Sequence, residues 1–356
     1  MAKNDLAMQQ QLSKNRMEVS FDTYDLAVRQ LVDMFQESTL RISPEYQRHF
    51  VWDDIRQSQL VESLLLGIPV PSLFMATNSD FSWEVVDGLQ RLTTLIRFIG
   101  ESEALELLAS KGKNHVPYTP LRLTGLEKLT EFNNLTFTEL PTTIRTMFKH
   151  RPIKVTVLND KSDENVRYDL FERLNTGGII LEPQEIRNCV YQGPFNEFLK
   201  QCSRNTNFRK VVKLGAKPKE SSYEELVLRF FAYLDWQNKF VHDVKEFLND
   251  YMKHQVNSNF NADSYSRIFE RTFDQLALLL DEGIIRGNRK TITPIVLFEA
   301  ISVGVANHLK KSDQVIDKNK INLLLNDSTL KSYTTGATNS QSKLNKRIEY
   351  VLENLT

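Results

Sequence analysis

One segment places groups that could bind phosphate where a predicted strand meets a predicted helix. It runs from Trp83 to Leu95 and reads Trp-Glu-Val-Val-Asp-Gly-Leu-Gln-Arg-Leu-Thr-Thr-Leu. A β-favouring run ends at Asp87-Gly88, and apolar residues with helical spacing follow at once. A strand that stops at a glycine and continues as a helix presents backbone N–H groups. These groups and the helix dipole attract phosphate. Arg91 would add a forked cation, and Thr93 or Thr94 a hydroxyl, near the first helical turn.

The same residues have a simpler interpretation. Asp-Gly before a helix is also an ordinary turn, and Arg91 could be a solvated surface charge. Because short motifs also match by chance, the neighbouring elements must decide between the two interpretations.

Elements on both sides of this segment follow a recognisable order. Asp53 predicts the N-cap of a helix that ends at Gly67, and residues 68–75 predict a strand with prolines at its entry. Residues 153–158 predict a further strand, and a helix with Val166, Leu170 and Leu174 on one face follows it. Pro183 opens another helix, after a Gly-Gly turn.

These blocks resemble the ParB/sulfiredoxin-like superfamily, and within it the N-terminal domain family of GmrSD-type modification-dependent restriction enzymes. The matching segments are Tyr46-Gln47-Arg48 with Trp52, Gly67 to Pro71, Asp87-Gly-Leu-Gln-Arg91, and Asn175-Thr-Gly177-Gly178 followed by Gln184 to Asn188. Leu89 stands where the family usually has the first Gln of Asp-Gly-Gln-Gln-Arg. If that Gln contacts nucleotide or catalytic water, hydrolysis is in doubt while phosphate binding survives.

The resemblance implies binding of a nucleoside triphosphate with Mg²⁺, and in some relatives its hydrolysis. Backbone amides from Gly88 onward would hold phosphate and Arg91 would neutralise it. Asp87 would position Mg²⁺ or a ribose hydroxyl, and Gln90 would orient a phosphate oxygen or water. The further expected nucleotide-binding residues are Tyr46, Gln47, Arg48, Thr93, Thr94, Arg173, Asn175, Gly177, Gly178, Glu185, Arg187 and Asn188.

Two interpretations stay open for the second signature. Its polar residues could form a second wall of the nucleotide site, facing Asp87 to Arg91. Alternatively, they form a capping and salt-bridge network that fixes one helix against another, with Glu185 satisfying an arginine. Tyr46 likewise suits either base stacking or a place in the core.

Composition limits the classes of function. The chain has 356 residues, with 45 Lys+Arg and 45 Asp+Glu, so its formal net charge is zero. That balance argues against a dedicated nucleic-acid coat. Residues 200–219 could form a local basic patch, but a flexible linker is favoured because Gly215 and Pro218 interrupt them. Cys189 and Cys202 predict buried thiols, and we expect a soluble, cytoplasmic protein with no membrane span.

The sequence shows no nuclease or P-loop signature. The six histidines are scattered, and no HExxH, PD-(D/E)xK or GxxxxGK[ST] pattern occurs in a suitable setting. A self-sufficient nuclease is therefore not expected. After about residue 191 the pattern is helical, with helices expected near 243–254, 263–282, 294–311 and 343–354 and with Ser221 and Thr293 as caps.

The predicted architecture is α+β. A polar extension at 1–19 precedes a ParB-like domain at 20–190, which has a small mixed sheet and a helical insertion at about 101–150, and an all-helical domain follows at 191–356.

The predicted function is a nucleotide-binding component, with NTPase activity left open, of a prokaryotic anti-phage or restriction-type defence system that acts with DNA or a separate effector. The alternative is a non-enzymatic regulatory or scaffolding subunit that binds a partner nuclease or toxin. The nucleotide base, the partner and the oligomeric state stay open.

Overall fold

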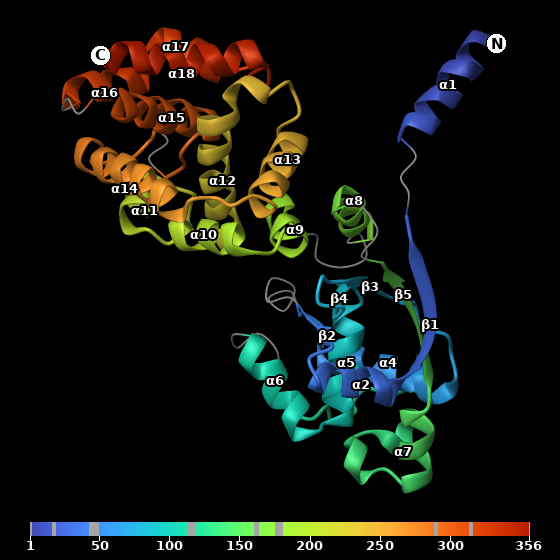
Figure 1. Cartoon of the computed structure of the whole chain (residues 1–356). Coiled ribbons are helices and arrows are strands. Elements are labelled where there is room, and N and C mark those ends of the chain that lie inside the picture. Colours follow the sequence, from blue (N-terminus) through green and yellow to red (C-terminus); the bar gives the residue numbers. More distant parts are fainter. Residues whose placement is uncertain are drawn as a thin grey trace. The chain divides into compact units, whose positions relative to one another are not determined.

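The computed structural model describes residues 2–15, 19–42, 50–112, 119–159, 164–174, 181–287, 291–312 and 316–355. Its internal contacts divide the chain into two compact units, Met1–Leu181 and Glu182–Thr356. The first unit runs from blue to green in Figure 1, and the second from yellow-green to red. This boundary falls earlier than residue 190, where the sequence placed it, so helix α9 (Pro183–Val190) lies in the second unit.

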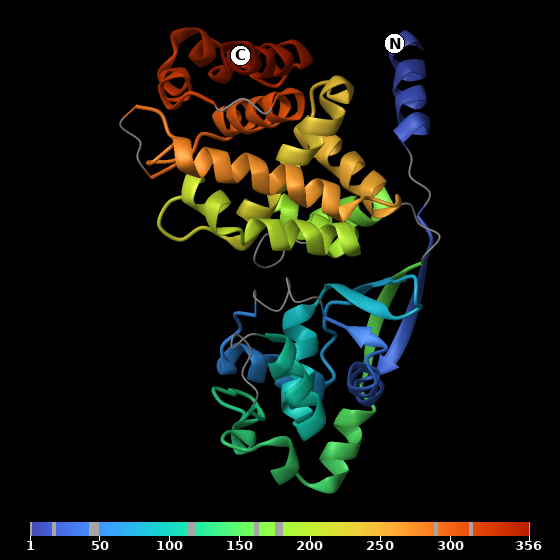
Figure 2. The same ribbon diagram turned by 60° about the vertical axis from the view of Figure 1, so that its left-hand side comes forward.

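The first unit is built on a mixed five-stranded sheet. Its strands are β1 (Phe21–Ala27), β2 (Leu40–Arg41), β3 (Leu73–Thr77), β4 (Trp83–Asp87) and β5 (Pro152–Leu158), in the order β1-β5-β3-β4-β2. The pairs β1–β5 and β3–β4 are antiparallel, whereas β3–β5 and β2–β4 are parallel. Figure 2 shows β1 and β5 side by side at one edge. The predicted α+β class and small mixed sheet are confirmed.

Helices cover the core side of this sheet. Val155 and Val157 of β5, Met75 of β3 and Val85 of β4 are all buried, as expected for strands with one face packed in a core. The helix α5 (Leu89–Ile99) packs against both α2 (Val28–Gln36) and α4 (Asp54–Leu66). Asp53 caps α4 by accepting a hydrogen bond from the Arg56 amide, and Gly67 ends it in the left-handed conformation. Both helix signals predicted from the sequence are confirmed.

The expected helical insertion is present between α5 and β5. It contains α6 (Ser102–Gly112), two short 3₁₀ helices (Thr130–Phe132 and Phe137–Glu139) and α7 (Thr142–Lys149). Phe137 and Phe148 from this insertion pack edge-on or tilted around Phe98 of α5, with ring centroids 5.0–6.0 Å apart. This aromatic cluster fixes the insertion to the helix that carries the Asp-Gly signature. Among the described residues, this unit also contains the helices α1 (Ala2–Asn15) and α8 (Glu164–Leu174).

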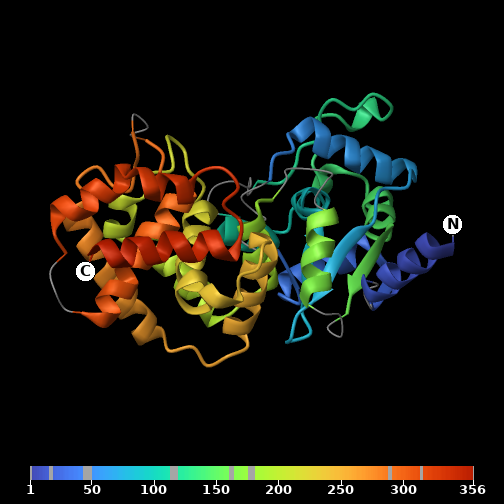
Figure 3. The ribbon, with the colours of Figure 1, turned by 90° about the horizontal axis from the view of Figure 1, so that it is seen from above.

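The second unit is helical throughout its named elements, as predicted, apart from one isolated β-bridge between Leu214 and Ile292. After α9 come α10 (Pro194–Ser203), α11 (Thr206–Val211), α12 (Glu220–Trp236), a 3₁₀ turn (Gln237–Lys239), α13 (Val244–Val256), α14 (Ala262–Leu279), α15 (Ile295–Lys311), α16 (Lys318–Asn326), α17 (Ser328–Thr334) and α18 (Gln341–Leu355). Figures 1 and 3 show these helices in successive layers, with α15 between α12 and α18.

Local details in this unit differ from the sequence expectations. Helix α12 begins at Glu220 after Lys219 with no side-chain cap, so Ser221 is not its N-cap. Thr293 does not cap α15; its hydroxyl instead accepts a hydrogen bond from the Lys213 amide. Residues 200–219 do not form a flexible linker, because they contain the end of α10 and all of α11. The long-range pairing of Lys213 and Leu214 with residues 292–293 was not visible in the local sequence pattern.

A chain of buried ion pairs connects the layers of the second unit. Arg187 of α9 pairs with Glu225 of α12 at 3.2 Å, and Glu225 pairs with Arg229 at 2.8 Å. Arg229 pairs with Glu299 of α15 at 2.8 Å, and Glu299 pairs with Arg347 of α18 at 2.6 Å. Glu299 and Arg347 are each only 2 % exposed. Because the Glu299 carboxylate contacts both the buried Arg347 and the partly buried Arg229, it offsets part of the desolvation cost of both guanidinium groups.

Replacing Glu299 by Gln should therefore destabilise the second unit strongly. We expect the free energy of unfolding to fall by about 3–5 kcal/mol, since the buried Arg347 loses its carboxylate partner and Arg229 loses one of its two. Chemical denaturation followed by circular dichroism measures the change. Glu349→Gln on the exposed side of α18 is the matched control and should change stability by less than about 0.5 kcal/mol. Equal effects of the two substitutions would contradict the role assigned to Glu299.

Candidate functional site

The turn between β4 and α5 is fixed by a glycine. Gly88 is the N-cap residue of α5 and has φ +107° and ψ 15°, in the left-handed region that other residues rarely adopt. A Cβ at this position would lie 2.3 Å from Cδ2 of Leu73 on the neighbouring strand β3. Gly88 has no side chain, so the N-cap residue itself supplies no acceptor for the backbone N–H groups of the first helical turn. The predicted strand–glycine–helix junction is confirmed.

Asp87 and Arg91 form an ion pair across this turn. One Nη atom of Arg91 lies 2.8 Å from Oδ2 of Asp87 and also donates to the Ser72 carbonyl at 3.2 Å. The Asp87 side chain is 37 % exposed and that of Arg91 is 16 % exposed. Nε of Arg91 is buried and has no hydrogen-bond partner. A partly exposed guanidinium with unused donor capacity is suited to a second anionic partner.

Gln90 holds the segment that leads into α4. Its Oε1 accepts hydrogen bonds from the amides of Val51 and Trp52, each at 3.1 Å. The Trp52 carbonyl in turn accepts a hydrogen bond from Gln57. In the sequence, two residues separate Val51 and Trp52 from the Tyr46-Gln47-Arg48 segment. Gln90 therefore positions the backbone next to the first signature block.

The other residues at the start of α5 face inward. Leu89 is only 6 % exposed, and both Thr93 and Thr94 are fully buried. The Thr94 hydroxyl donates to the carbonyl of Gln90 within the helix. These threonine hydroxyls are therefore withdrawn from solvent, and we assign neither of them a phosphate contact.

A buried arginine that was not among the residues predicted from the sequence fixes α5. Arg97 is buried, and one Nη donates to Asp54 at 2.9 Å and to Gln57 at 2.6 Å, both on α4. Its Nε donates to the Thr119 carbonyl at 3.3 Å. An arginine between Ile96 and Phe98, within an otherwise apolar run, was the available signal. Arg97 holds the two helices that frame the Asp87–Gly88 turn.

The second signature packs α9 inside the second unit. Arg187 is 1 % exposed, and besides Glu225 it donates to Asn249 at 2.8 Å and to Gln184 at 3.1 Å. Asn188 is buried and donates to Glu224. Of the two interpretations left open by the sequence, these contacts are those of the network that fixes one helix against others.

Glu185 has a capping role. It completes a capping box with Glu182 at the start of α9 and lies 3.6 Å from the Lys219 ammonium group. Arg173 is exposed near the end of α8. Six predicted binding residues lie outside the described part of the chain: Tyr46, Gln47, Arg48, Asn175, Gly177 and Gly178.

Metal ligands and reactive thiols are sparse in the described residues. No group of three or more His, Cys, Asp or Glu side chains that could hold a metal ion occurs among them. At the turn, Asp87 is a single carboxylate, which fits Mg²⁺ that arrives with a phosphate ligand and keeps several waters. Cys189 and Cys202 are buried, as predicted, and burial raises the pKa of Cys202 to about 12. None of the helices in the described ranges has the length and apolar character needed to span a membrane.

Comparison with known proteins identifies the first half of the chain. Residues 30–192 match the family model of the GmrSD restriction endonuclease N-terminal domain. This match confirms the resemblance inferred from the signatures: residues 30–192 are similar to that N-terminal domain. A search of curated proteins finds no match. Among solved structures, the chain is similar to a Pnob8-like ParB-N domain, at 12 % identity over 96 % of this chain and 100 % of that chain, with a TM-score of 0.23.

Substituting Gly88 by Ala should disturb the turn more than the same change at another left-handed glycine. Gly67→Ala is the matched control, because Gly67 has φ +76° but its nearest neighbours would lie 3.5 Å or more from a new Cβ. We expect about 1 kcal/mol of destabilisation for Gly67→Ala from backbone strain. Gly88→Ala should cost about 2–4 kcal/mol, because the contact with Leu73 adds overpacking. Thermal or urea unfolding measures both, and equal losses would contradict the close packing at Gly88.

Acid should weaken the ion-pair chain at Glu225. Burial alone raises the pKa of this carboxyl, but Arg229 and Arg187 outweigh it and hold the pKa below the ordinary value of 4.5. A depressed carboxyl pKa contributes stability above the ordinary value, and that contribution is lost as pH falls through the folded-state value. The free energy of unfolding should therefore decrease below pH 4.5. Urea unfolding between about pH 3 and pH 7 should show a shallower acid dependence for Glu225→Gln than for wild type; parallel curves would contradict the assignment.

Proposed function

We propose that the GmrSD-type domain binds the phosphates of a nucleoside triphosphate at the β4–α5 turn. In this proposal the chain is the nucleotide-binding component of a prokaryotic anti-phage or restriction-type defence system. One observation carries the proposal: Gly88, in a left-handed conformation and without a side chain of its own, brings the start of α5 beside a partly exposed Asp87–Arg91 pair. Helix N-termini of this kind are ready-made anion sites.

Each group at the turn has a part in binding. The first backbone amides of α5 donate hydrogen bonds to phosphate oxygens, and the helix dipole adds a favourable field. Arg91 neutralises the phosphate charge, turning part of its guanidinium from Asp87 and the Ser72 carbonyl toward the ligand. Gln90 acts through the backbone of Val51 and Trp52 and so positions the wall of the site that precedes α4.

Asp87 is the acidic member of the site. Once phosphate occupies Arg91, the Asp87 carboxylate becomes available to a water ligand of the Mg²⁺ that accompanies a triphosphate, or to a ribose hydroxyl. When bound, Mg²⁺ would neutralise part of the negative charge of the phosphates. The base of the nucleotide is not specified by these residues.

The domain match also supports the wider setting of the proposal. A GmrSD-type N-terminal domain suggests that the chain acts with DNA and, in this proposal, with a separately encoded effector protein. The chain could also act as an oligomer. NTP hydrolysis at the turn is a further part of the proposal. Leu89 bears on hydrolysis because it replaces the first Gln of the family signature.

A second function is favoured by the burial of Leu89. Where the family usually has a polar Gln, this chain has an apolar side chain that is 6 % exposed. Gln90, the remaining Gln of the signature, already accepts two backbone hydrogen bonds. A turn of this kind suits binding without turnover, as in a regulatory or scaffolding subunit for a partner nuclease or toxin. Brisk NTP hydrolysis by the purified chain alone would contradict this second function.

Replacing Arg91 by Ala should weaken nucleotide binding. A charge-assisted phosphate contact contributes about 1.5–3 kcal/mol, so the dissociation constant should rise by roughly ten- to hundredfold. Calorimetric titration with GTP, ATP and CTP in the presence of Mg²⁺ measures it, and circular dichroism checks that the variant is folded. Arg122→Ala is the matched control, since Arg122 is an exposed arginine of the helical insertion that pairs with Glu139. Unchanged affinity in folded Arg91→Ala would contradict the proposed site.

A further inference from the structure

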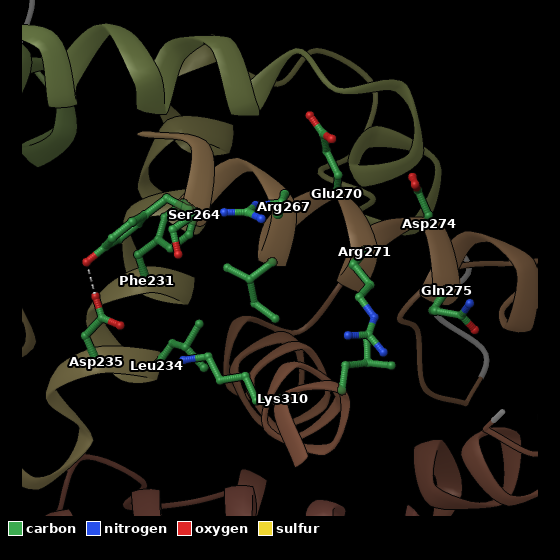
Figure 4. Close-up of a pocket in the computed structure, with 13 residues that line it drawn as sticks. Phe231, Leu234, Asp235, Ser264, Arg267, Glu270, Arg271, Asp274, Gln275 and Lys310 are labelled. Atoms are coloured by element: carbon green, nitrogen blue, oxygen red, sulfur yellow. Dashed lines mark hydrogen bonds between the residues drawn. The ribbon is translucent and has the colours of Figure 1, made fainter. Parts of the chain in front are cut away.

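The pocket between α12, α14 and α15 does not favour a charged ligand of either sign. Its volume is about 750 Å³. Its charged lining residues are equally divided between acids and bases: Asp235, Glu270, Asp274, Arg267, Arg271 and Lys310. Figure 4 shows the charged ends of Arg271 and Lys310 directed to different sides of the pocket. A surface that selects its partner more closely lies in the first unit, at the edge of the sheet.

The described sheet of the first unit ends in two strands of very different length. β2 forms one edge and has two residues, whereas β1 forms the other edge and has seven (Figure 1). β1 pairs with β5 along its whole length in one continuous register. Residues 21–25 of β1 are all exposed. A long, regular edge strand is a template for pairing with another strand.

Backbone hydrogen bonds to β5 identify one set of β1 residues. The Ser20 carbonyl accepts a hydrogen bond from the Asn159 amide at 2.9 Å. The Val28 amide donates one to the Arg151 carbonyl, also at 2.9 Å. These two pairs continue the β1–β5 register at its two ends. Because hydrogen-bonded and non-hydrogen-bonded pairs alternate in an antiparallel ladder, the even-numbered residues of β1 bond to β5 through their backbone groups.

The odd-numbered residues of β1 direct their backbone groups the other way. Ala27 lies opposite Pro152, which has no N–H to donate, as expected for a non-hydrogen-bonded pair. Phe21, Thr23 and Asp25 share this orientation, because each is an even number of residues from Ala27. Their N–H and C=O groups therefore face away from β5, toward the open edge of the described sheet.

The side chains of β1 do little to protect this edge. Asp25 pairs with Lys154 of β5 at 3.3 Å, and Asp22 accepts a hydrogen bond from the Asn159 side chain at 3.1 Å, so both carboxylates are directed to β5 or its end. β1 contains no proline or lysine, and its continuous register leaves no β-bulge within the strand. Phe21 is 58 % exposed. These features favour pairing at the edge, because prolines, lysines and bulges are what usually prevent it.

A second copy of the chain fits the edge in one register. A two-fold axis between antiparallel strands brings one residue opposite its own copy. An axis at Asp22 would place two carboxylates opposite each other, which is unfavourable. An axis at Tyr24 would draw in Ala27, which is half-buried where the chain enters α2. An axis at Thr23 pairs the exposed residues 21–25 with themselves.

We propose that β1 is a dimer interface, at which the β1 strands of two copies of this chain pair antiparallel about a two-fold axis at Thr23. Thr23 lies opposite Thr23 of the second copy, and Phe21 lies opposite Asp25 of the second copy, and the reverse. Each of these pairs exchanges two backbone hydrogen bonds, which makes about six across the interface. The two sheets become one continuous sheet, and no carboxylate lies opposite another. This interface goes beyond the proposed function and does not depend on nucleotide.

Cysteine substitution in the full-length chain tests the register. Thr23→Cys places two cysteines opposite each other, with Cα atoms about 5.5 Å apart and within disulfide range. Mild oxidation should therefore produce a covalent dimer on a non-reducing gel. Tyr24→Cys is the matched control, because this exposed neighbour would lie about 8 Å from its own copy, beyond disulfide range. The native Cys189 and Cys202 are buried and do not compete.

Blocking the edge tests the dimer itself. Thr23→Pro removes an N–H that faces the open edge, so β1 still pairs with β5, and Phe21→Lys adds a charge at the edge. Sedimentation of the full-length chain without nucleotide should show a dissociation constant that rises at least tenfold in both variants. Phe81→Lys is the matched control, because Phe81 is an exposed phenylalanine in the turn between β3 and β4, away from β1. Melting curves establish that each variant is folded.

Three results would overturn the proposal. They are a wild-type chain that stays monomeric throughout the concentration series, a dimer whose dissociation constant is unchanged by both Thr23→Pro and Phe21→Lys, or a Tyr24→Cys variant that crosslinks as fast as Thr23→Cys. Nucleotide binding at the β4–α5 turn is measured by its own titration, so a failure of the dimer interface and a failure of the triphosphate site are distinguishable.

Discussion

The absence of a side chain at residue 88 is the constraint on which the first unit depends. Gly88 has φ +107°, and a Cβ added to it would lie 2.3 Å from Cδ2 of Leu73. Because glycine has no Cβ, β3 can lie directly against the start of α5. That approach places Ser72 within reach of Arg91, and Arg91 within reach of Asp87. Arg97 then fixes the same helix to α4 through Asp54 and Gln57. The chemistry proposed for the turn therefore rests on packing contacts made by one glycine and one buried arginine.

The second unit is organised differently, around alternating charges inside a helical core. The chain from Arg187 to Arg347 joins α9, α12, α15 and α18, and each carboxylate in it contacts two guanidinium groups. Such pairs are costly to bury and costly to break, so they favour one arrangement of helices over others. Arg187, which belongs to the second signature, thus has a structural role here.

Short-range features were largely predictable from the sequence. The capped helix from Asp53 to Gly67, the strand ending at Asp87 and the pairing of Glu225 with Arg229 all follow from local spacing, and the structure contains each of them. Contacts between distant segments were not predictable. The roles of Thr293 and Arg187 depend on residues about 40 to 80 positions away, and a local pattern carries no information about such partners. The burial of Thr93 and Thr94 likewise depends on how α5 packs in the core.

The most direct measurement for the phosphate site is a crystal structure of the chain with a non-hydrolysable nucleoside triphosphate and Mg²⁺. The account predicts phosphate density at the backbone amides that follow Gly88, with the Arg91 guanidinium turned from Asp87 toward a phosphate oxygen. Nucleotide bound elsewhere, with the Asp87–Arg91 pair and its 2.8 Å contact unchanged, would contradict the account.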